Sequence, residues 1–175
     1  MVSIRPARTC RSTLSQSWSR YSRKKPRKSY VKAMPHTSLL VFNMGKQSQN
    51  YDLTLQLVSE QPIQIRSNSL EAARQVCNKY LEANMPQDYY FKILVYPHNV
   101  IREHKMASGA GADRISKGMA LSFGRPVSVA ARVQKDQPIF LLKTRTQNAE
   151  NARIALKRAT AKMSGSYKIK AKALQ

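Results

Sequence analysis

The stretch NSLEAARQVCNKYLEANMP, residues 68–86, has the clearest periodicity in the chain and decides the fold class. Its apolar side chains recur at the spacing of one helical face: Leu70, Ala73, Val76 with Cys77, and Tyr80 with Leu81. Asn68 and Glu71 are three residues apart, as in a capping box at a helix start, and Pro86 marks the end. The stretch therefore predicts an amphipathic helix that packs its apolar face into a core.

Strand-like segments flank this predicted helix. YDLTLQLVS, residues 51–59, alternates leucine with polar side chains, which is the period of a half-buried β-strand. Further strands are expected in SLLVFNMG, IQIRS, YYFKILVYP, VSVAARV, PIFLLKTR and YKIKAKAL. A second helix is expected in TQNAENARIALKRATAKMSG, residues 146–165, with Thr146 or Asn148 as its cap and Gly165 at its close.

The order of these elements suggests a loose duplication. The first unit has strands within 52–66, a helix at 69–84 and a strand at 89–96. The second unit repeats this order, with strands within 127–145, a helix at 147–163 and a strand at 166–173. Two helices on one face of a mainly antiparallel sheet make a two-layer α+β sandwich, which is the fold that this order predicts. The region 102–126 falls between the two units and is expected to protrude from them.

The charge of the chain indicates an anionic partner. Lys and Arg number 31 against 9 Asp and Glu, for a formal net charge of +22. Residues 1–46 hold 11 basic residues and no acid, whereas residues 47–101 hold 4 basic and 5 acidic ones. A protein that neutralises many phosphates needs such an excess. Binders of membrane surfaces and of acidic partners share it, so charge alone favours nucleic acid without selecting it.

The charge pattern divides the chain into a basic arm, residues 1–37, and a folded α+β body, residues 38–175, with a loop at about 102–119. The candidate RNA-binding cations are Arg5, Arg8, Arg11, Arg20, Arg23, Lys24, Lys25, Arg27, Lys28, Lys32 and Arg125. An acid-free, Arg- and Ser-rich N-terminus also describes a transit peptide. Against that alternative, Pro6 and Pro26 interrupt the segment and its apolar residues form no stripe.

The sequence carries no signal for a metal site, a cofactor or a membrane span. Cys10 and Cys77 lie far apart, and neither has a second Cys or a His at metal-ligand spacing. No apolar run approaches the roughly 20 residues that cross a bilayer. No cofactor is expected, apart from magnesium that accompanies bound RNA.

The segment REHKMASGAGADRISKGM, residues 102–119, is rich in both small residues and cations. It lacks the third glycine of a dinucleotide fingerprint and the Gly-Lys-Ser/Thr of a P-loop. Its histidine and acids have no nucleophile arranged beside them. Gly109 and Gly111 allow positive φ and close approach to phosphate, and the cations attract RNA. The pattern favours an RNA-insertion loop over the alternative, a mobile solvent loop.

The segments HNVIREHKMASGAGADRISKGM and FGRPVSVAARV, which begin at residues 98 and 123, carry a family resemblance. They resemble the archaeal form of the L-sixteen/L-ten-e family of large-subunit ribosomal proteins. The similarity continues through SLEAAR and NKYLE, and RPAR at 5–8 resembles the start of the family's arm. AMP at 33–35 and FNMG at 42–45 depart from the family pattern, as do Ser128 and Val129.

The resemblance implies a structural protein of the large subunit with no enzymatic activity. It implies binding to large-subunit rRNA, to tRNA at the aminoacyl site and to neighbouring large-subunit proteins, but no membrane and no homo-oligomer. It further implies a cytoplasmic location on the ribosome, and a role in translation and late subunit assembly. Two other functions stay open from the residues alone: a free-standing RNA-binding assembly factor and an RNA-modifying enzyme.

The resemblance also assigns the loop to the neighbourhood of the peptidyl-transferase centre. The residues concerned are Arg102, Lys105, Met106, Gly109, Gly111, Asp113, Arg114 and Met119, to which we add His104 and Lys117 of the same loop. Gly124 and Pro126 end the loop. The sequence leaves open whether Asp113 holds Arg114 or meets RNA through magnesium.

Overall fold

The computed structural model describes residues 31, 33–48, 50–120 and 122–173. Its elements are β1 (Asn43–Gly45), β2 (Leu53–Ser59), β3 (Ile63–Arg66), α1 (Ser67–Asn84), β4 (Tyr89–Ile93), β5 (Asn99–Glu103), α2 (Ala112–Ile115), β6 (Arg125–Val133), β7 (Pro138–Thr144), the 3₁₀ turn η2 (Thr146–Asn148), α3 (Ala149–Thr160) and β8 (Tyr167–Ala173). The two predicted helices are α1 and α3. The strand predicted over 38–45 is limited to the three residues of β1.

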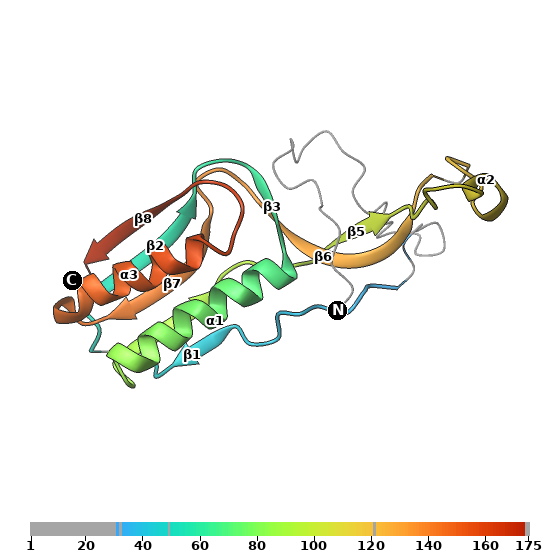
Figure 1. Ribbon diagram of the computed structural model, residues 1–175. Helices are drawn as coiled ribbons and strands as arrows, with labels where there is room; N and C mark the ends of the chain where they lie inside the picture. The colour runs from blue at the N-terminus through green and yellow to red at the C-terminus, as the bar shows by residue number, and fades with distance from the viewer. Residues whose placement is uncertain (1–30, 32, 49, 121, 174–175) are drawn as a thin grey trace.

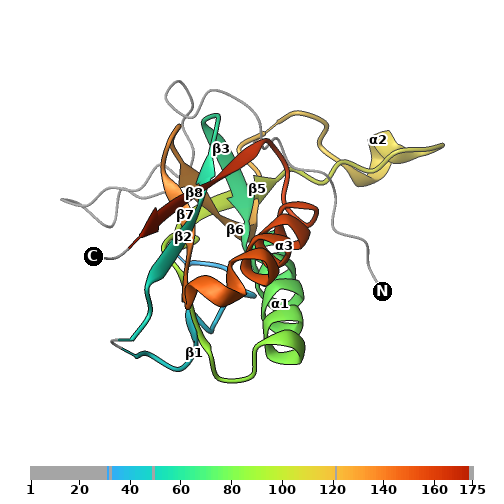
Figure 2. The same cartoon turned by 90° about the vertical axis from the view of Figure 1, so that its left-hand side faces the viewer.

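Helices and a sheet form the two layers of the molecule. β1, β4, β7, β2 and β8 make an antiparallel sheet in that order. α1 and α3 pack side by side across one face of this sheet (Figures 1 and 2). The predicted α+β sandwich is therefore confirmed. Figure 2 shows the other face of the sheet turned away from both helices.

A second, three-stranded antiparallel sheet joins β3, β6 and β5 in that order, where the sequence predicts one sheet. β2 pairs with β7, and β3, which follows β2, pairs with β6, which precedes β7. The segment β2–β3 and its partner β6–β7 therefore pass from one sheet to the other at the same place. At that corner the Ser59 N–H donates to the Gln137 carbonyl at 3.2 Å, and the Asp136 N–H donates to the Ser59 carbonyl at 2.8 Å. A two-residue alternation predicts which side chains face inward, but not where a paired ribbon bends.

The two units of the loose duplication interlock in space. β7 of the second unit lies between β4 and β2 of the first, and β2 lies between β7 and β8. Each unit therefore completes the sheet of the other, and the core is shared. This arrangement makes 39–173 one cooperative body and not two small domains.

The core lies between the five-stranded sheet and the helices. Phe91 and Phe140, on adjacent strands, meet edge to face with ring centroids 5.2 Å apart, and both are fully buried. The side chains that α3 buries are small apart from one leucine, which lets this helix approach α1 and the sheet closely: Ala152, Ala155, Leu156 and Ala159. Cys77 of α1 is buried in the same core, so its side chain acts as a packing group.

We expect Phe140→Ala to lower the free energy of unfolding by about 3–5 kcal/mol, because it removes a buried ring and leaves a cavity. Ile115→Ala is the matched control, since Ile115 is 81% exposed and its truncation should cost less than about 0.5 kcal/mol. Urea denaturation of the RNA-free protein measures both changes. Equal costs for the two variants would contradict the placement of the core.

The helix starts differ from the predicted caps. α1 has no side-chain cap, so the capping box predicted from Asn68 and Glu71 is wrong. Glu71 instead accepts two hydrogen bonds from Arg74, Nε to Oε2 at 2.8 Å and Nη2 to Oε1 at 2.6 Å. A bidentate, charge-assisted contact is stronger than a neutral cap bond. The Arg74 hydrogen bonds lower the pKa of Glu71 below its ordinary value. Asn148 precedes α3, also without a side-chain cap bond.

Candidate nucleic-acid interface

β5 and β6 form a hairpin that carries the loop predicted to insert into RNA. In Figure 1 this hairpin extends away from the helices and from the five-stranded sheet, and α2 lies at its end. The strand register shifts between Ile101 and Arg102, and such a bulge bends and twists the strand that carries it. The structure therefore confirms that the region between the two units protrudes.

Arg102 stabilises the neck of this hairpin, by which we mean residues 102–104 and the facing residues 123–125. Its Nη1 donates a hydrogen bond to the Phe123 carbonyl at 3.0 Å, and its Cζ lies 3.7 Å from the centroid of the Phe123 ring. The ring quadrupole attracts a cation in this position. The loop assignment treats Arg102 as a residue of the RNA-facing loop, whereas the structure places it half-buried in a contact between the two strands of the neck. An aromatic residue 21 positions away gives no sequence signal for this pairing.

Gly124 allows the backbones of the neck to approach each other. Its φ is +80°, and a Cβ at this position would lie 2.8 Å from the carbonyl carbon of Glu103 and 3.0 Å from the nitrogen of His104. Real Cβ atoms do not approach backbone this closely. The neck therefore requires glycine here for two reasons, the backbone conformation and the lack of space.

We expect Gly124→Ala to destabilise the neck by about 2 kcal/mol or more, since it adds a backbone clash to the strain of positive φ. Gly109→Ala is the matched control: φ is +122° there, but a Cβ would meet nothing within 4 Å. Its cost should be limited to backbone strain, about 1 kcal/mol. Amide hydrogen exchange of β5 and β6 measures both. Equal protection in the two variants would show that close approach at Gly124 contributes nothing.

The tip of the hairpin is a tight turn followed by one helical turn. Gly109 and Gly111 have φ of +122° and +77°, which confirms the predicted positive φ at both. The Ala112 N–H donates to the Gly109 carbonyl at 3.2 Å, and the Arg114 N–H donates to the Gly111 carbonyl at 3.1 Å. α2 follows directly from these bonds. All of its side chains lie at the surface, so it adds nothing to the core.

His104 closes the base of the tip. Its Nε2 lies 2.7 Å from the Gly118 carbonyl oxygen, which can only accept, so Nε2 carries the hydrogen of this bond. The sequence interpretation treats His104 as a polar surface or RNA-facing group. In the structure it is a half-buried link across the loop. The tip therefore has an internal anchor that its small residues do not reveal.

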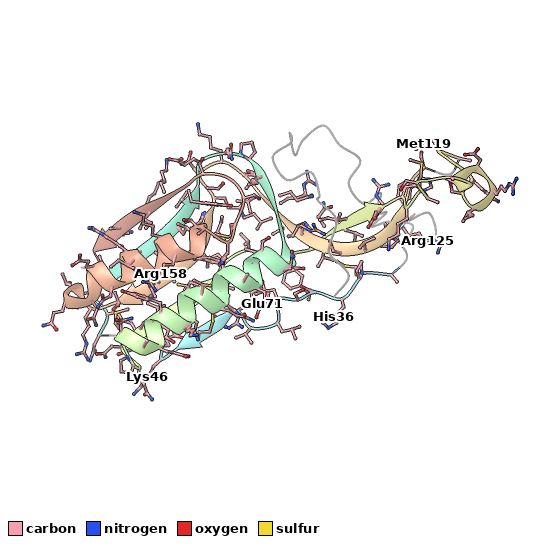
Figure 3. The ribbon with its side chains drawn as sticks, in the orientation of Figure 1. His36, Lys46, Glu71, Met119, Arg125 and Arg158 are labelled. Carbon is pink, nitrogen blue, oxygen red and sulfur yellow. The ribbon has the colours of Figure 1, made fainter. Side chains whose placement is uncertain are left out.

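The tip exposes cations and apolar side chains together. Its exposed cations are Lys105, Arg114 and Lys117. Its exposed apolar side chains are Met106 at 43%, Met119 at 65% and Ile115 at 81%. Figure 3 shows Met119 above and Arg125, also exposed, below the outer part of the hairpin. Ile115 was missed by the sequence reasoning, although a large aliphatic residue in a loop of small residues is itself a signal.

Asp113 lies in the first turn of α2, where a negative charge suits the helix end, and Arg114 follows it. Ion pairs of the described residues include those of Glu71 with Arg74, Asp88 with Arg145, and Asp136 with Lys168 and Lys170. Asp113 and Arg114 are not among these pairs. The structure thus gives no support to an Asp113–Arg114 pair within the isolated chain.

Ten of the predicted RNA-binding cations lie outside the described residues: Arg5, Arg8, Arg11, Arg20, Arg23, Lys24, Lys25, Arg27, Lys28 and Lys32. Val31 is the first described residue. It is buried and packs with Val100, Val129 and Phe123 on the smaller sheet. Contact between the arm and the folded body therefore begins before residue 37, the predicted end of the arm.

The described part of the chain offers little for catalysis. It contains no group of three or more His, Cys, Asp or Glu side chains placed to hold a metal ion. Burial raises the pKa of the Cys77 thiol to about 12, so this group is not a nucleophile at neutral pH. Within the same residues no helix has the length and apolar character to cross a membrane.

Comparison with known proteins gives the family. Residues 18–170 match the model of ribosomal protein L16p/L10e. The chain belongs to the L16p/L10e family. Among its relatives is the large ribosomal subunit protein uL16 of Archaeoglobus fulgidus, 42% identical over 156 residues that cover 89% of this chain and 90% of the relative. That of Methanococcus maripaludis strain C5 is 41% identical over 169 residues, 96% and 94% of the two chains. That of Methanococcus aeolicus is 46% identical over 144 residues, 82% and 83%.

Membership of the L16p/L10e family confirms the resemblance found in the sequence. It also confirms the interpretation of the chain as a structural ribosomal protein and not an enzyme, because the family consists of ribosomal proteins. The RNA-modifying alternative is therefore dropped. The protruding hairpin and its basic tip are accordingly features of a protein that works within an RNA-rich assembly.

Proposed function

We propose that this chain is a constituent of the large ribosomal subunit in which the β5–β6 hairpin inserts its tip into rRNA close to the peptidyl-transferase centre. There the tip helps to position tRNA at the aminoacyl site, while the sandwich and the basic arm bind rRNA and neighbouring proteins. The chain would act on the cytoplasmic ribosome, in translation and in late subunit assembly. The names of its relatives support the large subunit as its location.

The observation that carries this proposal is the form of the hairpin. Its neck is held by the contact of Arg102 with Phe123 and by the close backbone approach at Gly124, whereas its tip buries no side chain in the protein. A solvent loop has no need of a fixed neck that carries it away from the body. Arg and Lys at the tip can contact phosphate, and glycines with open space around them let RNA backbone approach closely.

RNA-associated magnesium belongs to the same proposal. Asp113 is exposed in the first turn of α2 and has no described ion-pair partner. A carboxylate beside packed phosphates requires a cation between them, and magnesium prefers oxygen ligands of this kind. Asp113 would then meet RNA through the ion.

Photo-crosslinking from the tip tests the proposal. A photo-crosslinking amino acid in place of Ile115, which is 81% exposed, should join the chain to rRNA of the peptidyl-transferase region or to aminoacyl-site tRNA in intact ribosomes. The same group in place of Glu150, exposed at the start of α3, serves as the control and should not reach these RNAs. Crosslinks from position 115 to proteins alone would contradict the proposal.

A further inference from the structure

The face of the five-stranded sheet opposite the helices has its own composition. In an antiparallel sheet, residues directly opposite each other point to the same face. The register aligns Tyr90, Lys143, Thr54 and Lys172 in one row across four strands. The next row on the same face aligns Lys92, Leu141, Gln56 and Lys170, and Lys168 follows opposite Val58. The alternate rows, which include Phe91 and Phe140, face the helices.

These two rows and Lys168 place five lysines on the face opposite the helices: Lys92, Lys143, Lys168, Lys170 and Lys172. Thr54 and Val58 lie buried between them. Lys143 is half-buried and the other four are exposed. Lys168, Lys170 and Lys172 occupy every second position of β8. Neighbouring lysines are therefore about 7 Å apart, because a strand rises about 3.4 Å per residue. We refer to this set as the lysine face. Neither α1 nor α3 covers it (Figure 2).

Within the described part of the chain, ion pairs give the lysine face a single compensating acid. Among its described neighbours the one carboxylate in an ion pair is Asp136, whose Oδ1 lies 3.0 Å from Lys168 Nζ and 3.6 Å from Lys170 Nζ. These cations lower the pKa of Asp136, the Lys168 hydrogen bond most of all. Lys92, Lys143 and Lys172 have no ion-pair partner among the described residues. Unopposed like charges on one face repel each other, and an anionic partner offsets that repulsion.

We propose that the lysine face docks the sugar-phosphate backbone of an RNA helix. It is a second RNA-binding surface, on the opposite side of the sheet from α1 and α3 and separate from the hairpin tip. Lysine acts as a mobile point charge that tolerates the varied geometry of a phosphate backbone. Gln56 and Tyr90 on the same rows add polar groups within reach of ribose hydroxyls, which RNA-binding surfaces contact. The choice of RNA as the anion rests on the proposed function.

The test measures binding of the full chain to large-subunit rRNA transcript as a function of salt. Lys92→Gln, Lys143→Gln and Lys172→Gln are combined in one variant, because none of the three has a described ion pair. We expect about tenfold or greater loss of affinity near physiological salt, and a salt slope lower by about 2, since each lost phosphate contact removes about 0.7–0.9. The corresponding Lys→Arg variant keeps the charge and should retain affinity. Thermal unfolding of the variants checks that the fold is intact.

The matched control makes the same change in charge on the helix layer, with Arg153→Gln, Lys157→Gln and Lys162→Gln, all exposed on or just after α3. Its affinity should stay within about twofold of the parent chain. Equal losses in the two triple variants would overturn the proposal, because net charge alone would then explain binding. An unchanged lysine-face variant would overturn it too. If the lysine-face variant binds rRNA normally but is missing from assembled subunits, the face binds a protein partner instead, and the proposal is overturned.

A further variant separates this inference from the proposed function. Neutralising Arg23, Lys24, Lys25 and Arg27 of the basic arm should lower rRNA affinity whether or not the lysine face binds RNA. If the arm variant loses affinity and the lysine-face variant does not, only the second surface is refuted. If neither loses affinity, rRNA is bound elsewhere on the chain, and both the lysine face and the electrostatic role of the arm are refuted. If the parent chain itself does not bind the transcript, the proposed function is refuted.

Discussion

Replacing residues 105–115 with a short Gly/Ser linker should leave the sandwich folded and strongly reduce ribosome activity. None of these residues is buried, so the free energy of unfolding should change by less than about 0.5 kcal/mol, or roughly 2 °C in Tm. The contact of Arg102 with Phe123 and the bond from His104 to Gly118 both lie outside the excised segment. The neck should therefore still form in the shortened chain.

The effect on the ribosome should be much larger, because the shortened hairpin no longer reaches the RNA that the tip contacts. Misplacement of reacting groups by about 1 Å can cost on the order of 10²-fold in rate, so we expect peptide synthesis or final subunit maturation to fall by at least tenfold. Thermal unfolding of the purified variant and peptide synthesis by ribosomes that carry it are the two measurements. A Gly/Ser replacement of unchanged length is the control that separates the reach of the hairpin from the chemistry of its tip.

Two outcomes would contradict this prediction in different ways. An unfolded variant would show that the tip stabilises the sandwich, against its lack of buried side chains. A stable variant with fully active ribosomes would make the segment a mobile solvent loop. The neck would then have no function that translation requires.

Affinity for large-subunit rRNA should fall steeply with salt. The net charge of +22 provides many candidate phosphate contacts, and each neutralised phosphate releases counterions. For about 6–10 contacts the loss between 50 and 200 mM salt is on the order of 10³–10⁵-fold. Filter binding or fluorescence anisotropy over that range measures the slope. Affinity that stays constant would show that phosphates do not drive binding.

Neutral replacements in the arm should flatten this dependence. Arg23→Gln, Lys24→Gln, Lys25→Gln and Arg27→Gln together should lower the slope by about 3, at about 0.7–0.9 per contact. These four residues lie outside the described part of the chain, so their contribution follows from charge alone. The control exchanges Arg for Lys and Lys for Arg at the same four positions, which keeps the charge and should preserve the salt slope. A slope that falls equally in both sets would contradict the electrostatic account.

Local patterns in the sequence were sufficient for the two long helices and for a loop that protrudes between the two units. They did not predict the strand β5 (Asn99–Glu103), whose pairing with β6 makes that loop the end of a hairpin. The apolar side chains of α1 recur every three to four residues, a period set within one element, so Leu70 and Leu81 could be assigned to the core without knowledge of the rest. The same holds for the alternation in β2. The tip was recognisable because small residues and cations cannot form a core. Positive φ at Gly109 and Gly111 was expected from residue type.

The functional contacts of the neck and the lysine face needed the tertiary structure. Arg102 meets a ring 21 residues away, and Lys172 shares a row with Lys143 and Tyr90 through strands distant in sequence. Capping by Asn68 was predicted wrongly because α1 begins at Ser67, with Arg66 at the cap position, so Asn68 lies inside the helix, while Glu71 bonds Arg74. In each case the local sequence allows a side chain or strand several contact partners. The partner that it takes depends on how distant parts of the chain pack.

The sequence by itself determined which side chains are apolar, charged or free to take positive φ, because these properties belong to single residues and their near neighbours. It thereby determined the two helices, the sandwich class and the cationic character of the chain. Only the tertiary structure decided that β2 lies between β7 and β8, and that the strands divide into two sheets. The physical reason is that strand pairing is non-local: Leu53 pairs with Ala173 across 120 residues, and the free energy of that choice comes from the shared core.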